Sequence, residues 1–200
     1  MCIRDSCGTE KRIRVSRTEE AVHLLRRLWS EDNVTHKGKH FTLTNVTVQP
    51  KPVQKNLPPI WFGGRSEPAL RRTAKIGDGW LVSQATPEEA GVGVQKIKSM
   101  ASEFGNDIED DHYGAIFSYC FADSPKEAEE LASPYLLRRR DDVSPKEMNA
   151  FGTPEELISM LDSYISSGIT KFALRPACPP EMTHQQMEIL GTDVIPRYHN

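Results

Sequence analysis

Short apolar or aromatic runs alternate with longer amphipathic segments through most of the chain. The runs are Ile60 to Phe62, Gly79 to Val82, Tyr113 to Ala122 and Lys171 to Arg175. Their lengths and the turn residues around them predict β-strands, and segments with helical spacing separate them. An alternation of strand and helix predicts an α/β fold with a parallel sheet, either open and doubly wound or closed into an eight-stranded barrel.

The helical segments carry clear start and stop signals. Apolar residues recur at helical spacing over Glu19 to Trp29 and over Leu157 to Ile165, and Gly168 is placed to end the second helix. A Ser/Thr-Pro-x-Glu pattern, which supplies a cap, a proline at the first helical position and a capping-box glutamate, occurs at Thr86, Ser124, Ser144 and Thr153. These signals predict helix starts and say nothing about chemistry.

One segment departs from this alternation. Between Val34 and Val48, short alternating runs flank His36-Lys-Gly-Lys39, which predicts a hairpin or an extended excursion over the surface. Such an excursion either covers a site or is a plain surface hairpin.

Composition restricts the class of protein. The chain has 200 residues, 38% hydrophobic side chains and a net charge of -3, so it can bury a core but has no general attraction to nucleic acid or to an anionic membrane. Its apolar runs are far shorter than the roughly 20 residues that span a bilayer. Four cysteines without CxxC spacing, Cys2, Cys7, Cys120 and Cys178, suit a reducing compartment. We therefore expect a soluble, cytoplasmic protein.

The first six residues, Met1-Cys-Ile-Arg-Asp-Ser6, are interpreted as non-native. They resemble a translated sequencing adapter and are set aside from fold reasoning, as tags are; the alternative is an unusual native N-terminus. Residues 7–200 are then expected to be the C-terminal part of a single domain. Four strand–helix units make half of a barrel, which fits a chain whose front was lost.

The glycine pair after the first predicted strand is the main candidate site. Gly63 and Gly64 follow Phe62, and a helix is predicted from Pro68 to Lys75 with Ser66 near its N-cap. Glycine allows a ligand to approach the backbone, and a helix start offers N–H groups and a positive partial charge, so phosphate suits this position. Arg65 adds a charge-assisted contact. The alternative is a plain turn, because the pattern is neither a Walker loop nor a complete GxGxxG motif.

A longer, ordered set of motifs favours the site. The set contains Leu28-Trp29, Gly38-Lys-His-Phe41, Pro50-Lys-Pro52, Pro58-Pro-Ile-Trp-Phe-Gly-Gly64, Ala69-Leu-Arg-Arg72, Gly77-Asp-Gly-Trp-Leu81, Gly152-Thr-Pro-Glu-Glu156, Gly168 and Lys171-Phe-Ala-Leu-Arg-Pro176. From about Arg17 to Pro196, the chain resembles the luciferase-like monooxygenase family of flavin- and deazaflavin-dependent oxidoreductases. The resemblance implies the C-terminal half of a (β/α)8 TIM barrel that uses reduced FMN or reduced coenzyme F420 at the C-terminal mouth.

The resemblance also implies which residues meet the cofactor. Those expected beside it, near its phosphate-bearing end, are Phe62, Gly63, Gly64, Arg65 and Ser66. No catalytic acid or base is assigned, because this family draws such groups largely from early strands. The parent protein is expected to act on a small organic substrate, to work with a flavin or F420 reductase, and to form a homodimer.

Two further charged residues have open interpretations. Arg175 ends the last predicted strand and is interpreted either as a ligand of a substrate carboxylate or cofactor phosphate, or as the partner of a neighbouring helix. Asp78 is assigned to the turn into the second strand in preference to ligand contact.

Other groups are given structural roles. Gly38 breaks any helix between His36 and His40, so no shared metal is expected. Arg138-Arg-Arg140 precedes Asp141-Asp142 and indicates a solvated loop or helix end. Cys120 is predicted to be a buried thiol.

Two other functions are considered. A phosphate-binding barrel isomerase or aldolase would place a Schiff-base lysine at the end of a strand, whereas Lys171 stands at the start of one. A non-enzymatic fragment with an exposed sheet edge would tend to aggregate.

Overall fold

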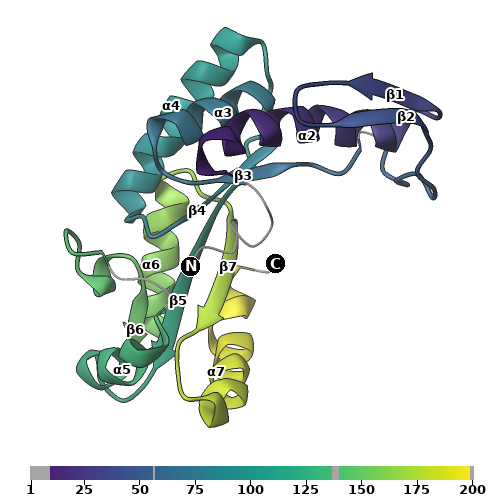
Figure 1. Cartoon of the computed structure of the whole chain (residues 1–200). Coiled ribbons are helices and arrows are strands. Elements are labelled where there is room, and N and C mark those ends of the chain that lie inside the picture. Colours follow the sequence, from purple (N-terminus) through teal and green to yellow (C-terminus); the bar gives the residue numbers. More distant parts are fainter. Residues whose placement is uncertain (1–9, 56, 137–139, 199–200) are drawn as a thin grey trace. The chain divides into compact units, whose positions relative to one another are not determined.

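The chain divides into two compact units, residues 1–60 and residues 61–200 (Figure 1). The computed structural model describes residues 10–55, 57–136 and 140–198. Residues 1–6, interpreted above as adapter-derived, lie outside the described residues. The units are described separately below.

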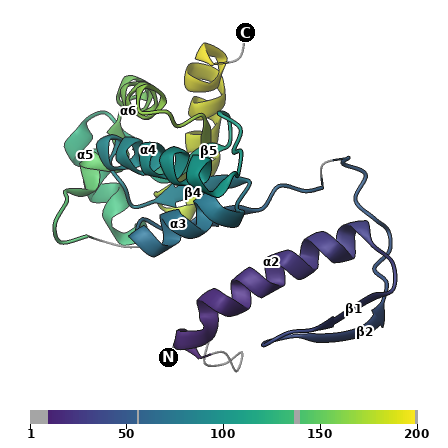
Figure 2. The same ribbon diagram turned by 90° about the horizontal axis from the view of Figure 1, so that it is seen from above.

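The first unit consists of one long helix and a hairpin. A 3-10 turn, η1 (Lys11–Ile13), leads into helix α2 (Arg14–Ser30), which begins earlier than the predicted Glu19. Strands β1 (Val34–Lys37) and β2 (Thr42–Val46) pair antiparallel, so the predicted hairpin is confirmed. Figure 2 shows α2 running along this hairpin.

Side chains tie the helix to the segments that follow it. The Glu20 carboxylate accepts hydrogen bonds from the backbone N–H groups of Lys39, His40 and Phe41, at 2.9 to 3.1 Å, and contacts His36 Nε2 at 3.1 Å. At the other end of α2, Lys51 Nζ donates to the Leu28 carbonyl oxygen at 3.0 Å. A lysine there satisfies a free helical carbonyl and complements the helix dipole.

The second unit is built on a five-stranded parallel sheet. Its strands are β3 (Trp61–Gly63), β4 (Gly79–Ser83), β5 (Tyr113–Phe121), β6 (Ala150–Gly152) and β7 (Lys171–Pro176). All four predicted strands are present, and the α/β class with a parallel sheet is confirmed. The sequence did not predict β6, which has only three residues.

The long strand β5 organises the sheet. Tyr119 of β5 pairs with Ala150 of β6 and with Pro176 of β7, so β6 and β7 lie on opposite edges of β5. Strand β4 pairs with the first half of β5, opposite β7, and therefore shares an edge with β6. Within the described residues, no strand pairs with the outer edge of β3 or of β7.

Two amide side chains complete the edges of β5 where its neighbours end. Asn149 Oδ1 accepts from the Ser118 N–H at 2.9 Å, between the stretches that pair with β4 and with β6. Beyond β7, Gln186 Oε1 accepts from the Phe121 N–H at 2.6 Å, and Gln186 Nε2 donates to the Phe121 carbonyl oxygen at 2.9 Å. These bonds pair buried backbone groups that no strand reaches.

Helices follow the strands. They are α3 (Glu67–Ile76), α4 (Pro87–Phe104), α5 (Pro125–Ala132), α6 (Pro154–Ser166) and α7 (Thr183–Ile189). Shorter turns are the 3-10 segments η2 (Ser133–Tyr135), η3 (Pro145–Glu147), η4 (Pro180–Met182) and η6 (Ile195–Arg197), and the π-helical η5 (Leu190–Val194).

The predicted helix starts at Thr86, Ser124 and Thr153 are confirmed. At Thr86 the capping box is reciprocal: the Thr86 N–H donates to Glu89 at 3.0 Å, and the Glu89 N–H donates to the Thr86 hydroxyl at 3.2 Å. Ser124 Oγ accepts from the Glu127 N–H, and the Thr153 N–H donates to Glu156. Ser144 differs in outcome, because it begins only the 3-10 turn η3.

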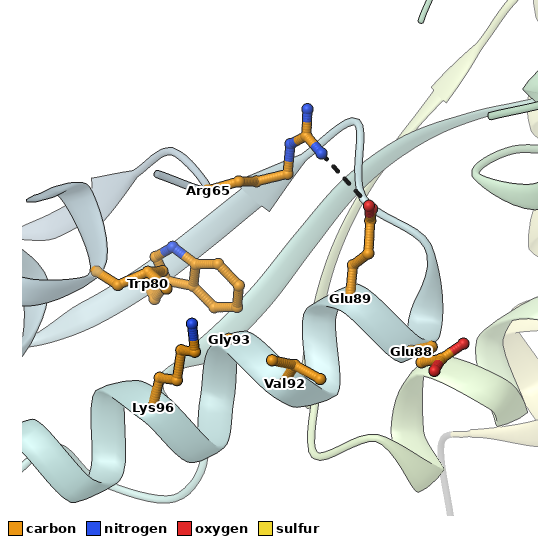
Figure 3. Close-up of a pocket in the computed structure, with 8 residues that line it drawn as sticks. Arg65, Trp80, Glu88, Glu89, Val92, Gly93 and Lys96 are labelled. Atoms are coloured by element: carbon orange, nitrogen blue, oxygen red, sulfur yellow. Dashed lines mark ion pairs between the residues drawn. The ribbon is translucent and has the colours of Figure 1, made fainter. Parts of the chain in front are cut away.

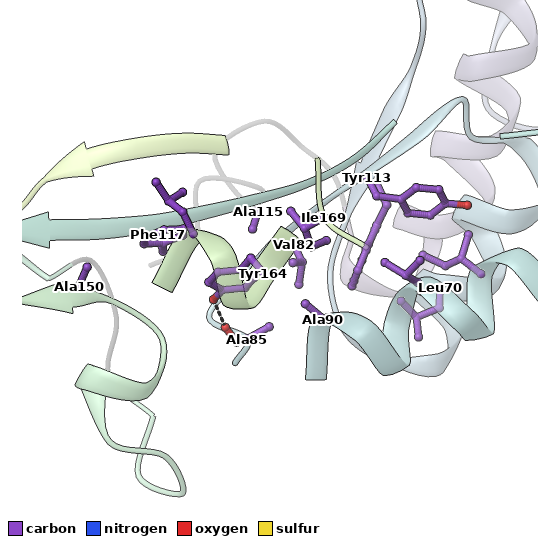
Figure 4. Packing of buried hydrophobic residues seen from close by; sticks show 14 of the residues in the cluster. Leu70, Val82, Ala85, Ala90, Tyr113, Ala115, Phe117, Ala150, Tyr164 and Ile169 are labelled. Carbon is purple, nitrogen blue, oxygen red and sulfur yellow. Dashed lines mark hydrogen bonds between the residues drawn. The ribbon is translucent and has the colours of Figure 1, made fainter. Parts of the chain in front are cut away.

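The core lies between the sheet and the helices (Figure 4). Alternate residues of β5, from Tyr113 to Phe121, belong to it together with Trp80 of β4 and Leu157 of α6. The Tyr164 hydroxyl donates to the Ala85 carbonyl oxygen at 2.6 Å, so this buried phenol is satisfied. Because side chains alternate along a strand, the intervening residues of β5 point to the side of the sheet opposite α3, α4 and α6, where Cys120 packs with Ala128 and Ala132 of α5. We call that side the inner face.

No helix in the part of the chain that the structure describes combines the length and the apolar character needed to cross a membrane.

Candidate functional site

The predicted site lies where β3 ends and α3 begins. Gly63 ends the strand, and Ser66 occupies the N-cap of α3 with extended backbone and no capping hydrogen bond from its side chain. The Ser66 carbonyl oxygen accepts from the N–H groups of Ala69 and Leu70, which starts the helix. The predicted strand, glycine pair and helix are therefore present in this order.

The backbone here depends on glycine. Gly64 has a φ of +104°, where a side chain is strained, and a Cβ would lie 3.1 Å from the Ala69 Cβ. A Cβ on Gly63 would lie 3.2 Å from the Leu81 carbonyl oxygen. The Gly64 carbonyl oxygen accepts from Trp80 Nε1 at 3.0 Å. The hydrogen bond from strand β4 thus fixes the turn, and the main chain of Gly63 and Gly64 is exposed to solvent.

Arg65 stands at the rim of a cavity beside this turn (Figure 3). The cavity has a volume of about 280 Å³ and lies between α3 and α4, on the helix side of β4. Its lining combines Leu70 and Trp80 with the charged groups of Arg65, Glu88, Glu89 and Lys96. Arg65 Nη1 is 3.6 Å from Glu89 Oε2, whereas Lys96 pairs with Glu67 at 3.1 Å.

Glu89 belongs to a cluster of four charged residues, which we call the Arg140 cluster: Arg65, Glu89, Arg140 and Asp142. Arg140 Nη1 and Nη2 donate to the two oxygens of Glu89 at 2.6 and 2.9 Å. Arg140 Nε and Nη2 donate to the two oxygens of Asp142 at 3.0 and 2.6 Å. Arg140 also donates to the Gln84 carbonyl oxygen at 3.0 Å. This one guanidinium therefore links the loop after β4 to the loop before β6.

The charges shift the titration of these groups. Hydrogen bonding from Arg140 holds the pKa of Glu89 below its usual range, with a smaller electrostatic contribution from Arg65. The same guanidinium lowers the pKa of Asp142 to about 2, and Arg65 again contributes. Both carboxylates raise the pKa of Arg140. At neutral pH two negative and two positive charges face one another.

The structure places Phe62 differently from its neighbours. Phe62 is 9% exposed, and its ring packs against α3, with the Arg72 guanidinium 5.6 Å from the ring centroid. Gly63, Gly64, Arg65 and Ser66 are exposed. A cofactor at this strand end would therefore meet the main chain of Phe62 rather than its ring.

Arg175 lies elsewhere, on the inner face of β7. Its Nη2 donates to the Ser118 hydroxyl at 3.2 Å and to the Tyr135 carbonyl oxygen at 2.7 Å. Strand β7 is three strand positions from β3, or about 14 Å at the usual spacing. The described residues give no contact that joins Arg175 to Arg65. Its bond to Tyr135 matches the interpretation as a partner of a neighbouring segment.

Other sequence interpretations can be located. Asp78 lies in the bend before β4, at the opposite end of that strand from the mouth. Cys120 is fully buried, and burial raises the pKa of its thiol to about 11, so the predicted buried thiol is confirmed. Arg140 is not solvated as expected, because its side chain is only 11% exposed. Arg138 and Arg139 lie outside the described residues.

Histidines and carboxylates give no convincing metal centre in the described ranges. His36 contacts Glu20 whereas His40 contacts Ser16, so the two rings have different partners. Glu109, Asp111 and His112 approach one another, but both acidic residues are exposed. His112 Nδ1 is 2.6 Å from the Asp78 carbonyl oxygen.

The comparisons with known proteins bear on the whole arrangement. The family model described as luciferase-like monooxygenase matches residues 3–152. The chain belongs to this family. An FMNH(2)-dependent dimethylsulfone monooxygenase of Pseudomonas fluorescens is 28% identical over 139 residues, which cover 70% of this chain and 36% of that protein. An F420-dependent glucose-6-phosphate dehydrogenase of Nakamurella multipartita is 21% identical over 212 residues, or 94% of this chain and 61% of that protein.

Solved structures of the luciferase-like type have the same fold. An F420-dependent secondary alcohol dehydrogenase in complex with an F420-acetone adduct superposes with a TM-score of 0.77 at 23% identity, over 96% of this chain and 64% of that one. A monooxygenase from Streptomyces bottropensis also gives 0.77, at 19% identity, over 98% and 65%. The chain thus spans between one third and two thirds of these relatives. The predicted luciferase-like α/β architecture, as part of a barrel, is confirmed.

Sequence reasoning missed the Arg140 cluster and the Trp80 bond. Glu89 was recognised as a capping residue, and it does cap α4, but the same carboxylate also receives Arg140 from 51 positions away. The adjacent Arg140, Asp141 and Asp142 were a usable signal for local pairing, which Arg140 and Asp142 confirm. Nothing local indicated that Glu89 would join them.

Proposed function

We propose that this chain forms part of an oxidoreductase that uses reduced FMN or reduced F420 and acts on a small organic substrate. The observation that carries the proposal is the bare turn Gly63–Gly64 beside the Arg65 guanidinium, at the end of a strand in a luciferase-like fold. Relatives named for FMNH(2) and for F420 support either cofactor.

The residues at this turn fit the anionic end of such a cofactor. Glycine leaves the main chain open where a Cβ would crowd Ala69 or Leu81, and the start of α3 adds a positive partial charge. Arg65 supplies a full charge at the rim of the cavity. Phe62 supports the turn from its packed position under α3, and Ser66 offers a hydroxyl at the N-cap. When bound, reduced FMN activates oxygen, whereas reduced F420 transfers a hydride.

Arg175 is proposed as a second anion-binding group, for a substrate carboxylate or a cofactor phosphate. It lies on the inner face, where its two hydrogen bonds hold it in place. For the parent protein we further propose a single domain that includes residues 7–200, a homodimer, a cytoplasmic location and a flavin or F420 reductase as partner. Residues 1–6 are proposed to be adapter-derived.

Two experiments test these proposals. Reading the gene upstream of the Cys7 codon tests whether four more strand–helix units precede it, and a native start codon there instead contradicts the interpretation of the chain as a C-terminal fragment. Anaerobic titration of the encoded protein with reduced FMN and with reduced F420, followed by fluorescence, tests the cofactor. Binding of one is expected, with about tenfold weaker binding in Arg65→Gln because a charge-assisted hydrogen bond is lost. Lys96→Gln is the matched control, and binding of neither cofactor would overturn the function.

The isomerase or aldolase alternative receives no support from Lys171. Its ammonium group pairs with Asp111 at 2.9 Å, at the start of β7 and away from the mouth. The fragment alternative is supported by the outer edges of β3 and β7, which no described strand pairs. Light scattering on the chain alone tests that alternative, since an exposed edge favours self-association.

A further inference from the structure

The four residues of the Arg140 cluster are not equivalent partners. Glu89 Oε2 receives Arg140 at 2.6 Å and the Thr86 N–H at 3.0 Å, whereas Arg65 stands 3.6 Å away. Glu89 Oε1 accepts from Arg140 Nη2 at 2.9 Å. Arg65 is therefore the weakest of the partners of Glu89, since its separation exceeds hydrogen-bonding distance.

The charge balance depends on Arg140. Glu89 and Asp142 together carry two negative charges, and Arg65 lowers the pKa of both, so both carboxylates act on its guanidinium. Arg140 makes hydrogen bonds to all four of their oxygens. The Arg140 side chain is 11% exposed, against 38% for Arg65. Arg140 is therefore held within the cluster, whereas Arg65 is accessible to solvent.

We propose that Arg140 is a positioning residue for the anion site: by engaging Glu89 and Asp142, it keeps their carboxylates from capturing Arg65. Without Arg140, the two carboxylates outnumber Arg65, and the guanidinium closes onto Glu89. An incoming phosphate would then compete with a formed ion pair and face uncompensated negative charge. This inference rests on the proposed role of Arg65, and it explains how an arginine beside two carboxylates remains available to an anion.

The test is a set of substitutions read by binding rather than by turnover. The probes are FMN, F420 and, as a competitor, inorganic phosphate, added to Arg140→Gln, Glu89→Gln and the double variant. Glu89→Gln keeps a side-chain oxygen that can accept from the Thr86 N–H, so the cap of α4 is retained. We expect Arg140→Gln to weaken binding about tenfold, as loss of one charge-assisted contact does. Adding Glu89→Gln to that background is expected to return affinity to within about threefold of wild type, because the carboxylate onto which Arg65 closes has gone.

Salt distinguishes this role from damage to the fold. Added KCl screens exposed charges, so it should narrow the affinity gap between wild type and Arg140→Gln, whereas a misfolded loop would not recover. Arg140→Lys is expected to rescue only in part, because an ammonium group cannot reach all four oxygens in the planar geometry of a guanidinium. Melting temperatures of all variants report on folding separately.

The outcomes are distinct. If Arg65→Gln weakens binding and Arg140→Gln does not, the inference about Arg140 is wrong while the anion site stands. If Arg140→Gln weakens binding but neither Glu89→Gln nor salt restores it, Arg140 acts through structure alone, which also overturns the inference. If Arg65→Gln binds either cofactor as wild type does, the proposed anion site at Arg65 fails and the inference about Arg140 fails with it. If the wild-type protein binds neither cofactor, the proposed function itself fails.

Discussion

The indole N–H of Trp80 donates to the carbonyl oxygen of Gly64 across 3.0 Å. Trp80 is 1% exposed, and its ring packs so closely on α4 that a Cβ at Gly93 would lie 2.4 Å from Trp80 Cη2. The bond therefore runs from a fixed core residue to the turn of the proposed site. The packing of β4 against α4 in this way sets the position of the loop after β3.

Trp80→Phe is expected to loosen that turn. The substitution removes the hydrogen bond, worth about 1 kcal/mol, and leaves part of the indole volume empty, so we expect a loss of about 2 kcal/mol in the free energy of unfolding. Urea unfolding measures the loss, and anaerobic titration of FMN and F420 should show weaker binding. Trp61→Phe is the control, since the Trp61 ring contacts His112 at a centroid distance of 5.2 Å with the rings tilted by 47° and does not reach Gly64. Equal effects of the two substitutions on cofactor affinity would contradict the role given to Trp80.

Gly64→Ala tests the need for glycine in the turn. A φ of +104° is unfavourable for an alanine, and the added Cβ would press on Ala69, so we expect a cost of about 2 kcal/mol or more. Gly105, which follows α4 with a φ of +65° and has nothing within 4 Å of its would-be Cβ, provides a control for positive φ without crowding. We expect about 1 kcal/mol for Gly105→Ala, again from urea unfolding. A Gly64→Ala variant as stable as Gly105→Ala would show that the turn can relax.

Gln186→Leu removes the amide that completes β5. Both the N–H and the carbonyl oxygen of Phe121 then lose their partner in a buried place, and each loss costs about 1 to 3 kcal/mol. We expect a total near 3 kcal/mol by urea unfolding, with faster hydrogen exchange at the Phe121 amide. Gln185→Leu, at the exposed neighbouring position, should change little. Normal protection of Phe121 in Gln186→Leu would mean that another group replaces the amide.

These residues also show which features of the fold could be predicted from the sequence. The helix starts were predictable, because a cap, a proline and a glutamate act within four positions, and so were strands long enough to show a run of apolar residues. Strand β6 was not, since three residues between a 3-10 turn and a helix cap carry no periodicity. The candidate turn at Gly63 and Gly64 was predictable for the same local reason.

Long-range polar partners could not be predicted in this way. Gln186 reaches Phe121 across 65 positions, and Arg140 reaches Glu89 across 51. A glutamine or an arginine in a polar segment has the same local pattern whether it points to solvent or into the structure, and only the packing of the intervening elements selects its partner. The sequence therefore indicated the turn of the candidate site but not the charges that balance it.

The Glu20 carboxylate makes the contact between α2 and the hairpin sensitive to acid. Although burial opposes ionisation, hydrogen bonds from His36 and from the backbone of Phe41 and His40 hold the pKa of Glu20 below its usual range. A carboxylate with a lowered pKa stabilises the folded state fully above its unfolded pKa of about 4.3, and this contribution is lost as the pH falls through the folded value. We therefore expect the hairpin to loosen below about pH 4, where the carboxylate binds a proton and becomes a weaker acceptor.

Glu20→Gln should loosen the hairpin at neutral pH, without protonation of the carboxylate. The amide offers one acceptor oxygen in place of two charged ones, so it cannot serve the N–H groups of Lys39, His40 and Phe41 together. Amide hydrogen exchange at Phe41 should be faster than in wild type at pH 7 and should lose its dependence on pH between 3 and 5, after correction for the intrinsic exchange rate. Glu19→Gln removes the neighbouring carboxylate of the same helix and should leave both properties unchanged. A wild-type protein whose Phe41 amide exchange does not become faster below pH 4, after the same correction, would contradict control of the hairpin by Glu20.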